Sequence, residues 1–261
     1  METPIKLDAL AIAAHPDDIE ITSGGLLIKM VKKGRAVGAL DLTRGEMGTY
    51  GDKEDRVAEA NRAGEIMGLA FRSQLDIPDS AVEANQLNRA KVARIIRDTR
   101  PELVLLPHWE QRHPDHLACS RLGYDACYLA GLKKAKLEGE PFRPRKIVYV
   151  SYFRNNDYSF LVDISEEMEL KMEAVAAYRS QFGDAAGEMI ARVLNNNDAG
   201  EYGARGDQAR NIFHPGENIF ELMHVRARQL GSMVGVRYAE AFTVREQMLV
   251  DDPQKLPVRS I

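Results

Sequence analysis

Cysteine is scarce in this chain of 261 residues, which contains only Cys119 and Cys127. Both lie in the segment 115–132, whose pattern we interpret as one helix. Eight helical residues rise about 12 Å, whereas a disulfide needs Cα atoms closer than about 7 Å, so the two thiols are not expected to pair. Unpaired, buried cysteines are typical of a reducing compartment. We therefore expect a cytoplasmic protein.

Long apolar runs are missing as well. No segment approaches the roughly 18 apolar residues that span a membrane, and the start Met1–Lys6 lacks the apolar stretch of a signal peptide. The formal net charge is −4 and the pI is about 5.9, which indicates no basic surface for nucleic acid. We expect neither a membrane nor a nucleic acid as a partner.

The chain does contain a regular alternation of strand-like and helix-like segments. Its 44% hydrophobic and 28% charged residues are typical of a globular protein, and its length suits a single domain over residues 1–261. The alternation predicts a Rossmann-like three-layer α/β fold with a mostly parallel sheet and a C-terminal α+β elaboration. Residues 183–216 lack periodicity and are interpreted as a loop insertion. The predicted strands cover 6–13, 36–42, 71–76, 102–107 and two pieces of 145–163, and the predicted helices cover 22–34, 54–68, 85–99, 115–132, 165–180 and 217–231.

Two short polar clusters carry the chemistry of this sequence. The first, His15-Pro-Asp-Asp-Ile-Glu20, follows the first predicted strand, and the second, His113-Pro-Asp-His116, follows the fourth. In a doubly wound sheet of order 3-2-1-4-5 these strands are neighbours and their connections diverge, which leaves a crevice at their carboxyl ends. We therefore expect the two clusters to meet at one site.

The residue types in these clusters suit a catalytic zinc ion. Zinc commonly takes three ligands from histidines and carboxylates and keeps one position open for water. One histidine and one aspartate of the first cluster, with one histidine of the second, would supply that set. Asp17 and Asp18 are adjacent, so their side chains diverge; one can bind the metal while the other acts as general base on the water.

The residues alone leave open which histidine of the second cluster binds the metal. His113 and His116 are three apart and share one face at a helix start, so one can be a ligand while the other faces the substrate. Asp115 could orient a histidine and fix its tautomer. The purely structural alternative is that Asp17 and Asp18 cap a helix and that His113 lies in a loop.

At these clusters the chain resembles the LmbE/PIG-L family of zinc-dependent N-deacetylases, which act on N-acetylglucosaminyl compounds. The family motif A-H-P-D-D-x-E stands here at residues 14–20, and H-P-D-H stands at residues 113–116. The likeness continues through residues 43–49, 181–182 and 235–242.

The resemblance implies a role for each matched residue. His15, Asp18 and His116 would be the zinc ligands, although this set also suits iron(II) or cobalt. Asp17 would be the general base. His113 would stabilise the oxyanion or protonate the leaving amine, and Asp115 would support His113. The products would be acetate and the free amine of an amino sugar, and a homo-oligomer is expected because members of the family form them.

Within the family, the chain is most similar to the bacillithiol-pathway deacetylases, which act on N-acetylglucosaminyl-malate. Malate carries two carboxylates, and arginine binds carboxylates with paired hydrogen bonds. We therefore expect Arg56 and Arg112 to bind the aglycone, while Tyr238 is a candidate phenol for the oxyanion. Mycothiol-pathway relatives carry a tyrosine two residues before the second motif, where this chain has Gln111.

Three other functions are alternatives to the deacetylation of N-acetylglucosaminyl-malate. The same chemistry could act on another N-acetylglucosamine conjugate or on a chito-oligosaccharide. A nucleotide-binding Rossmann-like module would carry G-x-G-x-x-G after the first strand, where this chain has His-Pro-Asp-Asp and only Gly24-Gly25 further on. A catalytically silent scaffold would not need the complete set of ligands and base.

Overall fold

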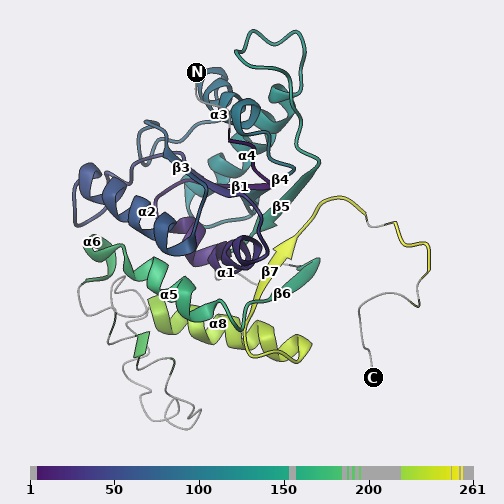
Figure 1. Ribbon diagram of the computed structural model, residues 1–261. Helices are drawn as coiled ribbons and strands as arrows, with labels where there is room; N and C mark the ends of the chain where they lie inside the picture. Colours follow the sequence, from purple (N-terminus) through teal and green to yellow (C-terminus); the bar gives the residue numbers. More distant parts are fainter. Residues whose placement is uncertain are drawn as a thin grey trace.

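The computed structural model describes residues 5–152, 157–183, 187, 190, 191, 194, 219–247, 249–252 and 254. Within them, seven strands form one sheet in the order β3-β2-β1-β4-β5-β7-β6 (Figure 1). The strands are β1 (Ala9–Ala13), β2 (Val37–Asp41), β3 (Phe71–Gln74), β4 (Leu103–Pro107), β5 (Lys146–Val150), β6 (Phe160–Asp163) and β7 (Ala239–Thr243). The described helices are α1 (Asp18–Lys32), α2 (Lys53–Met67), α3 (Gln86–Thr99), α4 (Pro114–Ala130), α5 (Met168–Ala176), α6 (Arg179–Phe182) and α8 (Ile219–Val234).

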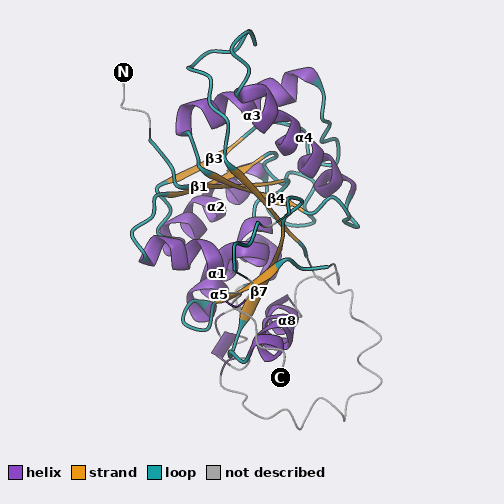
Figure 2. Ribbon diagram, turned by 90° about the vertical axis from the view of Figure 1, so that its right-hand side faces the viewer, coloured by secondary structure: helices purple, strands orange, loops and turns teal. Residues whose placement is uncertain are grey.

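The first five strands run parallel, in the predicted order 3-2-1-4-5. Helices cover both faces of this sheet, so the predicted three-layer α/β class is confirmed (Figure 2). The side chains of strand β1 show that both faces of the sheet are apolar. Its residues Leu10 and Ile12 pack in the core shared with α3 and α4. Ala9, Ala11 and Ala13 face the other way, toward α1 and α2, as expected for a strand that is buried on both sides.

Helix α1 begins four residues earlier than the predicted helix 22–34. Its N-cap is Asp17, whose φ of 97° lies in the left-handed region, and the helix starts at Asp18. Acidic side chains near a helix N-terminus are stabilised by the helix dipole, and Asp18 and Glu20 both lie in the first turn. The first polar cluster therefore lies partly inside the helix, where its side chains have fixed directions.

The C-terminal part completes the sheet with two antiparallel strands. Strand β7, at the segment 239–243 for which we predicted no element, lies between β5 and β6 and is antiparallel to both. Helices α5 and α8 pack beside it around a third apolar cluster that includes Ile164, Met172 and Phe220. This arrangement is the α+β elaboration expected after the parallel sheet.

Several other expectations concern single segments. Of the proposed insertion 183–216, the structure describes only residues 183, 187, 190, 191 and 194. The last four of these are helical, and Ile190 is buried. The rest of that prediction lies outside the described residues. Cys119 and Cys127 are free, buried thiols on α4. In the part of the chain that the structure describes, no helix is both long and apolar enough to cross a membrane.

Candidate active site

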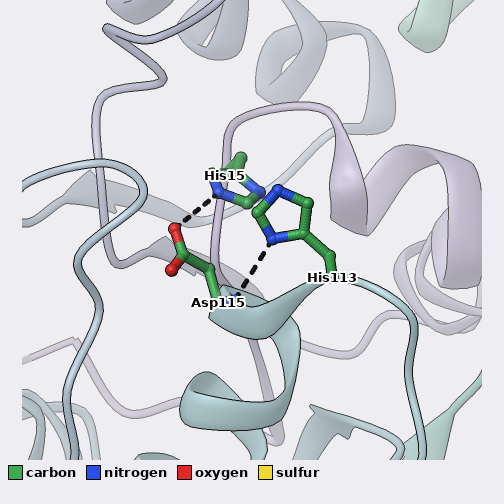
Figure 3. A group of neighbouring side chains, drawn as sticks. All are labelled: His15, His113 and Asp115. Atoms are coloured by element: carbon green, nitrogen blue, oxygen red, sulfur yellow. Dashed lines mark hydrogen bonds and ion pairs between the residues drawn. The ribbon is translucent and has the colours of Figure 1, made fainter.

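The two polar clusters meet at the carboxyl ends of β1 and β4. These strands are neighbours in parallel register, with Ala9 opposite Leu103. His15 follows the end of β1 by two residues, and His113 caps the N-terminus of α4, six residues after β4. Figure 3 shows the rings of His15 and His113 close together, with the carboxylate of Asp115 beside His15.

Three side chains form a compact group of potential metal ligands. His15, Asp18 and His116 each offer one ligand atom, and these atoms lie within 4.8 Å of one another. Asp18 Oδ2 is 3.4 Å from His15 Nδ1 and 3.3 Å from His116 Nε2. Both Asp18 and His116 are buried. Two imidazoles and one carboxylate at such spacing are the donor set that a catalytic zinc site uses.

The electrostatics of this group favour a bound cation. Burial lowers the pKa of His15, but hydrogen bonds to Asp18 and Asp79 outweigh it and raise that pKa to about 11. Burial raises the pKa of Asp18, but the charges and hydrogen bonds of His116 and His15 hold it well below its usual range. Carboxylates thus concentrate positive charge on His15, and a divalent ion could replace that proton. The residues present fit a metal ion.

The carboxylate of Asp115 contacts His15 rather than His113. Its Oδ2 is 3.2 Å from His15 Nε2 and accepts a hydrogen bond from the backbone N–H of Ser80 at 2.8 Å. Asp79 Oδ1 also lies 3.2 Å from the same ring nitrogen. With Nδ1 directed at Asp18 and Nε2 facing two carboxylates, His15 has the arrangement of a metal-binding histidine whose second nitrogen is held by an acid. The support of His113 by Asp115, implied by the family, stays a prediction: the negative charge of Asp115 acts to raise the pKa of His113, while its carboxylate contacts the His15 ring.

His113 has a different environment. As the N-cap of α4, its Nδ1 accepts a hydrogen bond from the backbone N–H of Asp115 at 3.2 Å. Its ring centroid lies 4.9 Å from those of both His15 and His116. Burial, followed by the charges of these two histidines, lowers the pKa of His113. The neutral form is thus favoured, and because Nδ1 is an acceptor, the proton of that form is on Nε2.

Asp17 lies beside the ligand group with an unusual backbone and an unusual pKa. Its φ of 97° is uncommon for a residue other than glycine, and such strain is often found at functional sites. Burial raises the pKa of Asp17 to about 7, although the charge of Arg56 opposes this. A carboxylate whose pKa is close to neutral is suited to general base catalysis.

Arg56 holds Asp17 instead of projecting toward an aglycone. Its side chain is buried, and Nη2 donates to Pro16 O at 2.5 Å and to Asp17 Oδ2 at 3.2 Å. The guanidinium also lies close against Gly45, where an added Cβ would be 2.8 Å from Arg56 Nε. The prediction that Arg56 binds substrate carboxylates is therefore not supported by its placement.

The other two predicted substrate-binding residues lie in contrasting positions. Arg112 is exposed, directly before His113. Tyr238 is buried in the third apolar cluster, and its hydroxyl pairs with His224 Nε2 at 2.9 Å. It is not grouped with the ligand histidines, because it directly precedes β7, which lies beyond β5 on the far side from β1. Arg112 thus remains a candidate for substrate contact, and Tyr238 does not.

Two site residues were not predicted from the sequence, namely Asp79 and Tyr152. The Tyr152 hydroxyl contacts Asp18 Oδ1, and its ring stacks on His116 at a centroid distance of 4.8 Å. Tyr152 follows β5, and Asp79 lies in the connection after β3. Both residues are therefore near the carboxyl ends of parallel strands. In such a sheet, ligands bind at these ends, so this position could have identified them as site residues from the sequence.

A buried ionic cluster next to the site includes Glu20, the last residue of the first motif. Arg72 contacts Glu20 and donates to Asp41 Oδ2 at 2.8 Å and to the Tyr178 hydroxyl at 2.9 Å. All three charged side chains are nearly inaccessible to solvent. This cluster ties α1 to β2 and β3, so Glu20 has a structural role in holding the start of α1.

Comparison with known proteins agrees with this geometry. The family described as PIG-L, GlcNAc-PI de-N-acetylase, matches residues 10–127. The diacetylchitobiose deacetylase of Thermococcus kodakarensis is 33% identical over 192 residues, which are 69% of this chain and 72% of that protein. The chain belongs to the PIG-L family. As a PIG-L protein it is a hydrolase of the N-deacetylase type that acts on N-acetylglucosamine-type compounds, and its His/Asp group is consistent with metal dependence.

Two further relatives of this PIG-L protein are informative. The probable N-acetyl-α-D-glucosaminyl L-malate deacetylase 2 of Bacillus subtilis is 28% identical over 210 residues, covering 74% of this chain and 91% of that protein. The crystal structure of the conserved protein TT1542 from Thermus thermophilus superposes with a TM-score of 0.78 at 38% identity, covering 94% of this chain and 97% of the other. The likeness to a PIG-L fold therefore extends through the C-terminal part.

Proposed function

We propose that this protein removes the acetyl group from N-acetylglucosaminyl-L-malate, as in bacillithiol biosynthesis, in a zinc-dependent hydrolysis. The observation that carries the hydrolytic part is the compact group of His15, Asp18 and His116 with Asp17 beside it. The malate part is supported by the likeness to the Bacillus subtilis protein and by Arg112, which is exposed next to His113 and could bind a carboxylate.

In this proposal the chain supplies a metal site, a base and a hydrogen-bond donor. A divalent ion held by His15, Asp18 and His116 would polarise the acetamide carbonyl and lower the pKa of a water. Asp17, with its pKa near 7, accepts a proton from the attacking water. His113 carries its proton on Nε2, because Nδ1 accepts from the α4 backbone, and this N–H can donate to the carbonyl oxygen as negative charge develops there.

The bond changes follow from these placements. A bond forms between the water oxygen and the carbonyl carbon, and the C–N bond of the amide breaks. The proton held on Asp17 passes to the departing nitrogen, so Asp17 returns to its charged form. The second proton of the water remains on the new carboxyl group and then passes to the amine, so acetate and the protonated amine of the sugar are released. Asp79 and Asp115 hold Nε2 of His15.

A second candidate substrate is a chito-oligosaccharide such as N,N'-diacetylchitobiose. The 33% identity to the Thermococcus kodakarensis enzyme favours it, as does the burial of Arg56, which removes one of the two arginines expected to bind malate.

An assay of acetate release tests both candidates. Purified protein is incubated with N-acetylglucosaminyl-malate, diacetylchitobiose or N-acetylglucosamine, with and without a chelator. We expect turnover to be highest on the malate conjugate and to stop with the chelator. An Arg112→Gln variant should raise KM for the malate conjugate and leave KM for diacetylchitobiose unchanged. Greater turnover of diacetylchitobiose by the wild type would replace the first candidate by the second.

A further inference from the structure

The side chain of Tyr152 contacts two of the three predicted metal ligands. Its hydroxyl contacts Asp18 Oδ1, and its ring stacks on the imidazole of His116, with the ring centroids 4.8 Å apart and the planes inclined by 17°. Asp18 is the first residue of α1, and His116 lies in the first turn of α4. Because Tyr152 follows β5 by two residues, it connects the end of a further strand to ligands that follow β1 and β4.

The end of β5 is held against the segment that leads to the second motif. Strands β4 and β5 are parallel neighbours. Beyond their last pair, the backbone N–H of His108 donates to Val150 O at 2.7 Å, and the buried side chain of Gln111 donates to the same oxygen at 3.3 Å. Val150 is the last residue of β5. The backbone of two neighbouring strands therefore sets the position of Tyr152 beside His116.

The two carboxylate oxygens of Asp18 have different environments. Oδ2 lies 3.4 Å from His15 Nδ1 and 3.3 Å from His116 Nε2, and it accepts a hydrogen bond from the backbone N–H of His15 at 2.9 Å. Oδ1 contacts the Tyr152 hydroxyl. A charged carboxylate can only accept hydrogen bonds, so the phenol is the donor. The oxygen that faces both histidines is thus the one that Tyr152 does not hold.

The side chain of an aspartate does not by itself determine which oxygen faces a metal. Its terminal torsion is broad and roughly two-fold, so rotation exchanges Oδ1 and Oδ2. A donor placed on one oxygen removes this freedom, and hydrogen bonds to carboxylate ligands orient such ligands in metal sites. In the described site, the hydroxyl of Tyr152 is in the position of such a donor on Asp18.

We propose that Tyr152 is a positioning residue of the metal site, which determines the oxygen of Asp18 that binds the ion. This inference rests on the proposed function for the identity of the ligands. The phenol donates to Oδ1 and holds the carboxylate so that Oδ2 faces His15 and His116. The ring of Tyr152, stacked on His116, restricts rotation of the imidazole, so that Nε2 stays directed at the same oxygen.

The zinc affinity of the full-length protein tests this proposal, with a chromophoric chelator as competitor. Tyr152→Phe removes the hydroxyl and keeps the stacked ring. We expect it to bind zinc roughly 10- to 100-fold more weakly than the wild type, the usual effect of removing a group that orients a ligand. Tyr152→Leu removes the hydroxyl and the ring, and should weaken binding at least as much.

Cobalt(II) gives a second measurement, because it suits the same ligands and its visible absorption bands respond to their arrangement. The bands of cobalt-loaded Tyr152→Phe should differ from those of the wild type. A loss of general stability alone would leave the spectrum of the bound ion unchanged.

The matched control is Tyr149→Phe, the same substitution within β5. The hydroxyl of Tyr149 is buried and has no hydrogen-bond partner among the described residues. This variant should therefore have the zinc affinity and the cobalt spectrum of the wild type. Circular dichroism confirms that each variant is folded before its affinity is measured.

Wild-type zinc affinity in Tyr152→Phe would overturn the proposal, and so would an equal loss of affinity in Tyr149→Phe. Slower acetate release by Tyr152→Phe at wild-type zinc affinity would place the hydroxyl on the substrate instead. Failure of the proposed function has a different signature, namely a wild type that binds zinc but releases no acetate from either sugar substrate. Zinc affinity is measured without substrate, so the two results are independent.

Discussion

The carboxylate of Asp115 lies 3.2 Å from Nε2 of His15, one hundred positions earlier in the chain. The contact spans two strand–helix connections and involves the nitrogen of His15 that faces away from Asp18. The imidazole of His15 is thereby held between two carboxylates: Asp18, a predicted metal ligand, faces Nδ1, and Asp115 faces Nε2. The affinity of the site for its metal should therefore depend on Asp115.

Asp115→Asn should weaken metal binding by roughly 10- to 100-fold, the usual effect of removing an acid that holds a ligand histidine. The substitution keeps the size of the side chain and an oxygen that can accept from the Ser80 N–H. Competition with a chromophoric chelator measures the affinity. Asp125→Asn, on the same helix and paired with Arg121 away from the site, is the matched control. Unchanged affinity in Asp115→Asn would show that the contact with His15 has no effect on the metal.

Asp17→Asn should keep its metal and lose turnover by about 10²- to 10⁴-fold, the range expected when a general base is removed. Asp18→Asn should lose the metal instead, because Asp18 stands between both ligand histidines. Metal content by atomic emission and the rate of acetate release are measured on the same preparations. Loss of metal from the Asp17 variant would make Asp17 a ligand and contradict its role as base.

Arg72→Met should destabilise the fold by about 3–5 kcal/mol, the cost of leaving buried charges without their partner. Glu20 and Asp41 would both lose the guanidinium that neutralises them. Denaturant unfolding measures the change in the free energy of unfolding. Arg62→Met removes an exposed pair with Glu65 and should change stability by less than about 0.5 kcal/mol. Equal effects of the two variants would contradict a structural role for the buried cluster.

Removal of the metal should lower the melting temperature. An ion present at about 100 times its Kd adds about 2.7 kcal/mol to the free energy of unfolding, which corresponds to about 5–10 °C for a chain of this size. A thermal melt with and without chelator measures the shift, and adding zinc back should restore it. His116→Ala should melt at the same temperature under both conditions. A full shift in that variant would show that the ion binds elsewhere.

The parallel part of the fold and the meeting of the two clusters were predictable from sequence. Strand–helix alternation indicates a parallel sheet, and the common doubly wound order 3-2-1-4-5 places β1 beside β4. That adjacency brings the loops that carry His15 and His113 together. Strand β7 was missed because its five residues pair with β5 and β6, which are distant in sequence, and no local pattern records such pairing. The burial of Tyr238 in the third apolar cluster, where its hydroxyl pairs with His224, could not be predicted for the same reason.

Side-chain partners within the site were harder to predict. The sequence predicts that Asp115 lies in the first turn of a helix. It does not predict that the backbone N–H groups of Ser80 and Val82 hold the Asp115 carboxylate near His15. Tyr152 belongs to neither of the two family motifs. For Arg56 the signal was present, because it shares a helical face with Ala60, Ala63 and Met67, all buried, so its side chain had to point inward.

Gly45 has a consequence for the evolution of this site. A side chain at position 45 would push against the guanidinium of Arg56, and Arg56 in turn holds Asp17. A change at position 45 can therefore alter the base without touching the substrate. Among related sequences, glycine at 45 and arginine at 56 should be kept together or lost together, and relatives that lose both need another way to hold the aspartate that corresponds to Asp17.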